Sequence, residues 1–456
     1  MIADMADQAN DQANHTEAAL RGGVTQTRII AADICTDIRI GFLLDPSFER
    51  RTNGLDPRDR RWTQELLYGM LRRRSWLDAI LADRVRGGLS RLDADVVDLL
   101  RLGLYQLLCM GSVPAYAAIA QTVELTKVRH GIGASKLANA VLRRTDRERG
   151  ALHISTPPDP IDALAQTYSH PRWIVARWVS RWGAEETAKL LEANNTEAPV
   201  IVRPYGVVRE QLEAMLEASG VEVSDAPLVE DSIRLGHGMA LTELGAFSQG
   251  LFFVQDPAAT LVTRYAAATP GSIVADLCAA PGGKTFELSR DAAVLYSGDR
   301  SITRMSRVLS TTKRIDAKRV FPFVHDARHP ALRAVDLVLI DVPCTGTGTF
   351  RRHPDARWRL KVSDLAVMAA VQRSIIRAAA PLVQRGGLLI YSTCSLEPEE
   401  NDMQIETFLN DHPEFVLEPP PDGVVPSTVL DAGRLRVLPQ KHGTDGAFAA
   451  RLRRVR

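Results

Sequence analysis

Short apolar runs alternate with helical patterns throughout residues 250–456, and this alternation constrains the fold more than any other feature of the chain. Such alternation predicts βαβ units around a parallel sheet, because parallel strands need crossover connections that are usually helices. The last two runs are expected to close the sheet as an antiparallel hairpin. We therefore predict a Rossmann-like α/β domain. The runs lie at residues 273–277, 294–298, 320–324, 335–340, 388–393, 435–438 and 447–452.

A different pattern precedes this domain. Apolar residues recur at three- and four-residue steps through residues 28–149, which predicts an all-helical module. A proline-rich stretch at residues 156–160 is a plausible linker between domains. The predicted organisation is a disordered leader at residues 1–23, a helical module at 24–150, a small α/β connector at 160–245 and the α/β domain at 246–456.

Composition sets broad limits on the class of protein. The chain has 56 Lys and Arg against 55 Asp and Glu, so net charge excludes neither nucleic acid nor acidic partners. Five cysteines without C-x-x-C spacing predict neither a disulfide framework nor a zinc site. No basic and apolar secretion signal is found, nor a run of about 18 apolar residues. We expect a cytoplasmic monomer without metal or membrane association.

The loop Ala280-Pro281-Gly282-Gly283-Lys284 lies between a predicted strand and a predicted helix. Its glycines allow a tight turn in which backbone N–H groups approach a ligand at a helix N-terminus. A P-loop would need glycine where Cys278 stands, and the dinucleotide motif G-x-G-x-x-G is missing. The remaining interpretation is a loop that binds S-adenosylmethionine.

Acidic residues end four successive strands of the predicted sheet, at Asp276, Asp299, Asp326 and Asp341. In a nucleotide-binding sheet, an acid after the second strand bonds ribose hydroxyls, which suits Asp299. Asp326 would then hold the adenine edge. Each acid taken alone is equally well explained as a helix cap or a solvated turn residue. Their repetition along one edge favours a binding site.

Two cysteines, Cys344 and Cys394, each follow a predicted buried strand. Chemistry gathers at the carboxyl ends of parallel strands, so both thiols are expected to face one pocket. The segment Glu397-Pro398-Glu399-Glu400 predicts a helix start whose dipole favours a thiolate at Cys394, whereas the nearby acids oppose it. A cysteine is more often a small buried apolar residue, an interpretation that suits Cys35 and Cys109 better.

The ordered motifs of the α/β domain resemble those of the Sun-type RNA cytosine-5 methyltransferases. The helical module is similar to the RNA-binding domain of the NusB antitermination factor, through shorter phrases at residues 55–60, 102–108 and 137–144. The two modules are paired in this way in bacterial small-subunit ribosomal RNA methyltransferases. The catalytic motifs are Asp276 to Thr285, Asp341-Val342-Pro343-Cys344-Thr345-Gly346-Thr347-Gly348, Tyr391 to Asn401 and Asp445-Gly446-Ala447-Phe448.

This resemblance implies methyl transfer to carbon 5 of a cytosine in RNA, with 16S ribosomal RNA as the expected substrate. Cys394 would be the nucleophile, Cys344 would assist product release, and Asp341 would hold the cytosine edge. Val342 and Ala447 depart from the usual family residues, Ala and Phe, without touching a proposed reacting group. The implied S-adenosylmethionine contacts are Cys278, Ala279, Ala280, Pro281, Gly282, Gly283, Lys284, Asp299, Asp326 and Asp341.

A basic stretch follows the proposed cytosine pocket. Arg351, Arg352, His353 and Arg357 are candidate RNA contacts, with Trp358 available to stack on a base. A solvated surface loop would explain the same run. A second basic surface on the helical module includes residues 58–61 and 72–74, although salt pairing along helices explains it equally well.

Three other functions compete with this interpretation. A non-catalytic RNA-binding or antitermination factor would lack S-adenosylmethionine binding, and complete cofactor and thiol motifs argue against it. A nicotinamide oxidoreductase is disfavoured by the missing dinucleotide motif. The same chemistry on transfer RNA or DNA remains open.

Overall fold

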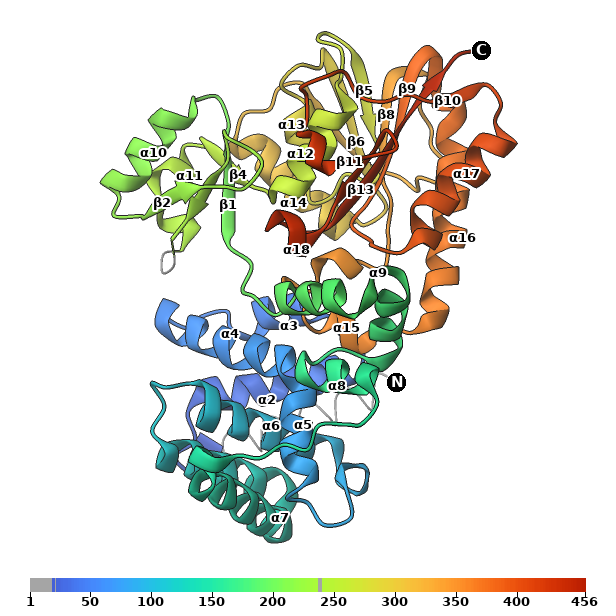
Figure 1. The fold of residues 1–456 in the computed structure, drawn as a ribbon. Coiled ribbons are helices and arrows are strands. Elements are labelled where there is room, and N and C mark those ends of the chain that lie inside the picture. Colours follow the sequence, from blue (N-terminus) through green and yellow to red (C-terminus); the bar gives the residue numbers. More distant parts are fainter. Residues whose placement is uncertain (1–18, 21, 237–239) are drawn as a thin grey trace, which may run out of the picture. The chain divides into compact units, whose positions relative to one another are not determined.

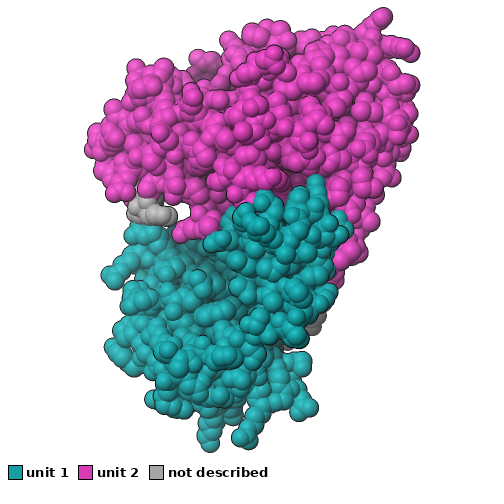
Figure 2. All heavy atoms as spheres, in the orientation of Figure 1, with its two compact units in different colours: residues 1–195, 353–359 teal, residues 196–352, 360–456 magenta. Residues whose placement is uncertain are grey.

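The computed structural model describes residues 19–20, 22–236 and 240–456, so most of the expected leader at residues 1–23 lies outside the described residues. The chain forms two compact units (Figure 2). Unit 1 comprises residues 1–195 and 353–359, and unit 2 comprises residues 196–352 and 360–456. The chain therefore leaves unit 2 for seven residues and then returns to it.

Unit 1 is helical, as predicted. Its α4 and α8 begin at Asp-Pro pairs: Asp56 and Asp159 accept hydrogen bonds from main-chain N–H groups, and the following proline occupies the first turn. The proline-rich stretch at residues 156–160 was expected to be a linker, and its last two residues instead cap and begin α8. The helices are α2 (Gln26–Arg39), α3 (Leu44–Arg51), α4 (Pro57–Arg72), α5 (Arg74–Ala82), α6 (Ala94–Cys109), α7 (Ala115–Arg147), α8 (Pro160–Thr167), α9 (Arg172–Ala193) and the short α15 (Ala356–Arg359).

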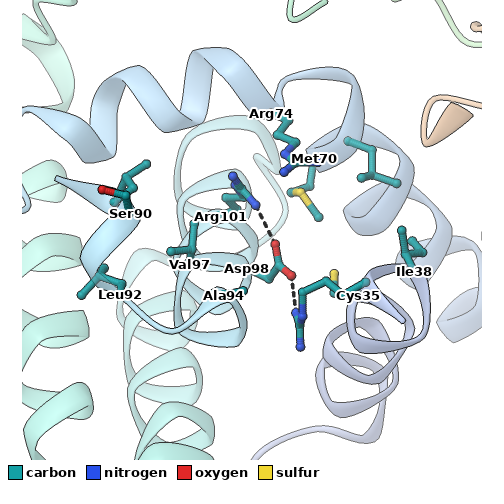
Figure 3. Close-up of a pocket in the computed structure, with 13 residues that line it drawn as sticks. Cys35, Ile38, Met70, Arg74, Ser90, Leu92, Ala94, Val97, Asp98 and Arg101 are labelled. Atoms are coloured by element: carbon teal, nitrogen blue, oxygen red, sulfur yellow. Dashed lines mark hydrogen bonds and ion pairs between the residues drawn. The ribbon is translucent and has the colours of Figure 1, made fainter. Parts of the chain in front are cut away.

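A cavity of about 350 Å³ lies among α2, α4, α5 and α6 of unit 1 (Figure 3). Its walls are mainly apolar, and its charged residues are largely paired. Asp98 lies between Arg39 and Arg101, with 2.7 Å between Asp98 Oδ1 and Arg101 Nη1. Arg101 also donates to both oxygens of Asp78, at 2.7 and 2.8 Å. These pairs offset the cost of placing charge in the cavity wall.

The smaller sheet of unit 2 is antiparallel, in the order β2-β3-β1-β4. It packs on α10 (Arg209–Ala218) and α11 (Gly245–Ser248) through a core that includes Val202, Leu216 and Phe252. The predicted connector is thus divided: its first two helices, α8 and α9, belong to unit 1, and the sheet extends past residue 245 to gain β4. The strands are β1 (Val200–Pro204), β2 (Val223–Asp225), β3 (Ile233–Leu235) and β4 (Phe252–Val254).

In the part of the chain that the structure describes, the larger sheet of unit 2 has nine strands, which confirms the predicted Rossmann-like domain. Its order is β11-β12-β13-β9-β8-β5-β6-β7, and β10 pairs with β13. Strands β5 to β9 are parallel, and β12 and β13 form the expected antiparallel hairpin. The strands are β5 (Ile273–Asp276), β6 (Val294–Asp299), β7 (Val320–Val324), β8 (Val335–Asp341), β9 (Val383–Thr393), β10 (Phe415–Leu417), β11 (Leu430–Asp431), β12 (Arg434–Val437) and β13 (Ala447–Arg454).

Both faces of the larger sheet are covered by helices (Figure 1). Val274 and Leu337 join the core beside α12, α13 and α14, whereas their neighbours Ala275 and Val338 join the core beside α16 and α17. Burial on both faces explains why these strands are continuously apolar. The helices are α12 (Pro257–Ala266), α13 (Gly283–Leu288), α14 (Ile302–Arg314), α16 (Val362–Ala379), α17 (Asp402–Asp411) and α18 (Pro439–His442).

One segment, Val362–Leu382, is long and apolar enough to cross a membrane by length and composition alone. It contains α16, whose Ile375, Ile376 and Ala379 are buried in the core beside the larger sheet. Packing in this core accounts for the apolar composition of the segment.

Candidate active site

The loops after β8 and β9 bring two cysteine thiols together at the carboxyl edge of the larger sheet. Cys394 follows β9 directly, and Cys344 lies three residues beyond the end of β8. Their Sγ atoms are 3.2 Å apart. The main chain fixes this approach, because Gly348 N donates to Cys394 O at 2.9 Å and Val342 N donates to Ser392 O at 3.0 Å. The two thiols therefore meet at the carboxyl edge of the sheet, where the sequence predicted that they would lie together.

Two glycines permit the close packing of these loops. A Cβ atom on Gly348 would lie 2.7 Å from Cys394 O and 2.8 Å from Gly446 Cα. Gly446 N also donates to Gly348 O at 2.8 Å. The Asp445-Gly446 turn thus supports the loop that carries Cys344, and a side chain at either glycine would separate the backbones.

A buried carboxylate organises the loop after Cys394. Glu400 accepts hydrogen bonds from Thr345 N and from Gln372 Nε2, each at 2.9 Å, and from the hydroxyls of Thr345 and Ser395. Asn401 Nδ2 adds a bond of 2.9 Å to Ser395 O. Sequence reasoning treated Glu400 only as one acid of a helix start and missed this role. Its nearness in sequence to Cys394 was the available signal.

The predicted helix start after Cys394 is a single 3-10 turn at Pro398–Glu400, and α17 begins only at Asp402. A short turn carries little of the dipole of an α-helix. The expected dipole contribution to a thiolate at Cys394 is correspondingly weaker. Positive charge near the thiols comes instead from Lys284.

The surroundings of Cys344 disfavour its ionisation. The hydrogen bond to Cys394, followed by burial, raises the pKa of the Cys344 thiol well above its usual range. Cys344 is therefore a thiol at neutral pH and can donate its S–H to Cys394 Sγ. Lys284 Nζ lies 2.7 Å from Asp341 Oδ2. Burial works to lower the pKa of Lys284, but the neighbouring Asp341 carboxylate holds it above its usual value.

The loop before α13 forms a tight cradle beside the thiols. Gly282 has φ of +110°, and a Cβ atom there would lie 2.7 Å from the ring of Phe286. Asp276, at the end of β5, accepts a 2.7 Å hydrogen bond from Thr285 Oγ1, and burial raises its pKa to about 7. Its Oδ1 atom has no hydrogen-bond donor in normal geometry among the described residues. Burial also raises the pKa of Cys278, which makes this thiol unreactive.

The other two acids lie at the ends of neighbouring strands. Asp299 ends β6, is buried, and accepts a 2.9 Å hydrogen bond from Ser301 N. Asp326 lies two residues beyond β7 and accepts hydrogen bonds from the main chain and side chain of Arg328, which hold its pKa well below the usual range. Both acids therefore have local turn roles. Asp341 ends β8 and accepts from Ser392 Oγ at 2.7 Å.

Most of the basic stretch after this site has structural partners, contrary to the expectation of RNA contact. Arg351 Nη2 and Arg352 Nη2 lie 2.8 and 2.6 Å from Asp256 Oδ2, and both arginines also pair with Asp445. Arg351 is buried, so its guanidinium cannot reach an RNA phosphate. The two arginines join the start of α12 to the Asp445-Gly446 turn.

The following residues pack within unit 1. Arg357 is fully buried and donates to Asn195 Oδ1 at 2.7 Å and to Asn194 O at 2.8 Å, and burial lowers its pKa to about 9. Trp358 Nε1 donates to Leu71 O at 2.9 Å. His353, half exposed, pairs with Asp45 at 2.8 Å. Arg357 and Trp358 therefore have structural roles in place of the expected contacts with RNA.

Among residues 19–20, 22–236 and 240–456, no group of three or more His, Cys, Asp or Glu is arranged to hold a metal ion.

Three family models match successive parts of the chain. Residues 25–147 match the NusB family, and residues 170–242 match the ferredoxin-like domain of RsmF/B-like methyltransferases. Residues 265–453 match the family described as 16S rRNA methyltransferase RsmB/F. The resemblance of the helical module to NusB is thereby confirmed, and the connector is identified as ferredoxin-like.

Curated relatives and a solved structure agree over nearly the full chain. The probable ribosomal RNA small subunit methyltransferase B of Synechocystis is 34% identical, covering 88% of this chain and 92% of the relative. The enzyme of that name from Vibrio cholerae is 32% identical, covering 94% and 98%. The crystal structure of a protein named PH0851 is 28% identical, with a TM-score of 0.78, covering 94% and 99%. The chain therefore belongs to the ribosomal RNA small subunit methyltransferase B family.

Proposed function

We propose that the protein transfers a methyl group from S-adenosylmethionine to carbon 5 of a cytosine in 16S ribosomal RNA, through a covalent adduct with Cys394. The observation that carries this proposal is the 3.2 Å approach of the Cys344 and Cys394 sulfurs beside the Lys284–Asp341 pair. We further propose that the protein acts as a monomer in the cytoplasm.

The chemistry of cytosine explains the need for a thiol. Carbon 5 is too weak a nucleophile to take a methyl group until a nucleophile has added to carbon 6. A bond between Cys394 Sγ and carbon 6 moves the electron pair of the carbon 5–carbon 6 double bond toward carbon 5. After methylation, loss of the carbon 5 proton restores the double bond and expels Cys394 as a thiolate.

The surroundings of the two thiols support a division of labour. The second thiol and burial raise the pKa of Cys344, which favours its protonated form, and we propose Cys394 as the sulfur that attacks and departs. We propose that Cys344 assists the departure step, through the hydrogen bond that joins the two sulfurs. Asp341 and Lys284 offer an acceptor and a donor to the polar edge of cytosine.

The residues around the glycine cradle fit S-adenosylmethionine. The buried Asp276 Oδ1 has no donor in normal geometry among the described residues, and a ligand hydroxyl or amino group would provide one. Asp299 is placed at the end of β6, where such sheets bind ribose, and Asp326 lies at the end of the next strand. The proposed contacts are residues 278–284, Asp299, Asp326 and Asp341. When bound, the cofactor supplies the electrophilic methyl group.

Substitution of each thiol separates the proposed roles. Cys394→Ala is expected to abolish methylation and to form no adduct, whereas Cys344→Ala should accumulate a covalent protein–RNA adduct that resists denaturation. Cys109→Ala, on a helix of unit 1, is the control and should methylate normally. An adduct that requires Cys344 and survives Cys394→Ala would reverse the assignment.

The RNA target needs a separate test. We expect that mapping 5-methylcytosine in ribosomal RNA, from cells with and without this protein, will show one or more sites lost from the small-subunit RNA. Loss only from transfer RNA would redirect the proposal to that substrate, and unchanged 5-methylcytosine in both RNAs would refute it.

A further inference from the structure

Helix α14 and the residues that flank it carry mostly positive charge. Between residues 300 and 319 the chain has seven Lys and Arg and a single acid, Asp316, although the whole protein is nearly neutral. The helix itself contains no acid. Met305 and Val308 bury its apolar side against the larger sheet, and Arg304, Arg307 and Lys313 are exposed.

Two of the seven cations serve the fold. Arg314 Nη1 donates to Phe252 O at 2.9 Å and to Phe247 O at 3.0 Å, and Arg319 Nη1 donates to Ala292 O at 3.0 Å. The remaining five are exposed, and we call them the α14 face. The α14 face consists of Arg300, Arg304, Arg307, Lys313 and Lys318.

The α14 face is poorly neutralised. Arg304 lies 3.5 Å from Asp299 yet keeps 56% of its side chain exposed, and Lys318 pairs only with the exposed Asp316. The side chains of Arg307 and Lys313 have no hydrogen-bond or ion-pair partner among the described residues. A helix that is merely solvated usually mixes charges, as α10 does with Arg209 beside Glu213. Exposed cations that no nearby acid neutralises favour the binding of a polyanion.

We infer that the α14 face binds the phosphate backbone of the substrate RNA. The inference rests on the proposed function only in taking RNA as the substrate. A helix of 13 residues is about 20 Å long, which gives room for several consecutive phosphates. Its first turn adjoins the cofactor cradle, because Arg304 donates to Ala280 O. RNA that follows the helix would therefore lead toward the carboxyl edge of the sheet.

Salt dependence provides the test. Each neutralised phosphate contributes about 0.7 to 0.9 to the slope of log affinity against log salt concentration. In the full-length protein, the triple variant Arg307→Gln, Lys313→Gln and Lys318→Gln should bind a transcript of small-subunit ribosomal RNA with a slope shallower by about 2 to 3. None of the three residues touches the cofactor cradle or the thiols.

A matched control carries the same change of charge on another part of unit 2. Arg373→Gln, Arg377→Gln and Arg385→Gln, on and after α16, should leave the slope unchanged, and thermal unfolding should show that both triple variants are folded. Equal slopes for the two triple variants would overturn the inference. If the wild type neither binds nor methylates the transcript, the proposed function itself fails. If it methylates and the α14 triple variant keeps the full slope, only this inference fails.

Discussion

Replacing Asp276 with asparagine should make unit 2 more stable at high pH. The Asp276 carboxyl is 1% exposed and accepts a hydrogen bond from Thr285 Oγ1 at 2.7 Å. Burial raises its pKa to about 7. Asparagine has nearly the same shape, can still accept the Thr285 hydrogen bond, and does not ionise. The substitution therefore removes the cost of a buried charge and little else.

The sign and size of the effect follow from proton linkage. An unfolded aspartate has a pKa of about 3.9, so between about pH 4 and 7 the folded protein holds one proton more than the unfolded chain. The free energy of unfolding of the wild type should therefore fall as pH rises through this window. A difference of about three pKa units corresponds to at most about 4 kcal/mol. Asp276→Asn should match the wild type near pH 4 and exceed it by about 2 to 4 kcal/mol at pH 8.

The measurement must report unit 2. All six tryptophans, at positions 62, 76, 173, 178, 182 and 358, lie in unit 1, so tryptophan fluorescence does not follow unfolding around Asp276. Hydrogen exchange of β5 and α13, at pH 5 and pH 8 without added cofactor, gives the local stability. Asp422→Asn, at an exposed carboxylate, is the control and should show no difference that depends on pH. An equal effect of Asp276→Asn at both pH values would refute the reasoning.

Three further substitutions test the packing of the two units. Gly348→Ala places a Cβ atom 2.7 Å from Cys394 O, so we expect the free energy of unfolding to fall by about 1 to 3 kcal/mol and the covalent adduct to form more slowly. An unchanged rate of adduct formation would contradict this. Glu400→Gln places an amide N–H₂ group beside the N–H and O–H groups that donate to Glu400. Thermal unfolding should then show a free energy of unfolding lower by about 1 to 3 kcal/mol, and an unchanged stability would contradict this. Trp358→Phe loses the bond to Leu71 O, so denaturation followed by the other tryptophans should show unit 1 weakened by about 1 kcal/mol, and no change would refute that role.

The catalytic sheet was predictable because its signals are local. Continuous apolar runs mark strands that are buried on both faces, and the residues that end them must gather at one edge. This reasoning brought Cys344 and Cys394 together and located Asp276, Asp299 and Asp341 at strand ends, as the structure has them. The roles of these residues in the reaction remain predictions.

The basic stretch shows where local reasoning fails. Arginine is rarely buried without a charged partner, so residues 351–357 looked like a surface that contacts RNA. The structure satisfies Arg357 with main-chain and amide oxygens at Asn194 and Asn195, more than 150 positions earlier in the chain. Arg351 is neutralised by Asp256 and Asp445, which are also distant in sequence. No periodicity or motif within the stretch itself could reveal partners so far away.

The same long-range packing changes how the helical unit should be defined. Residues 353–359 supply Trp358, whose ring lies 5.0 Å from the guanidinium of Arg74 and whose N–H is bonded to Leu71. They also supply the buried Arg357. The boundary predicted from sequence at residue 150 therefore removes part of the packing of unit 1. Contacts that cross such a boundary, rather than the end of a periodic pattern, decide whether the helical unit is complete.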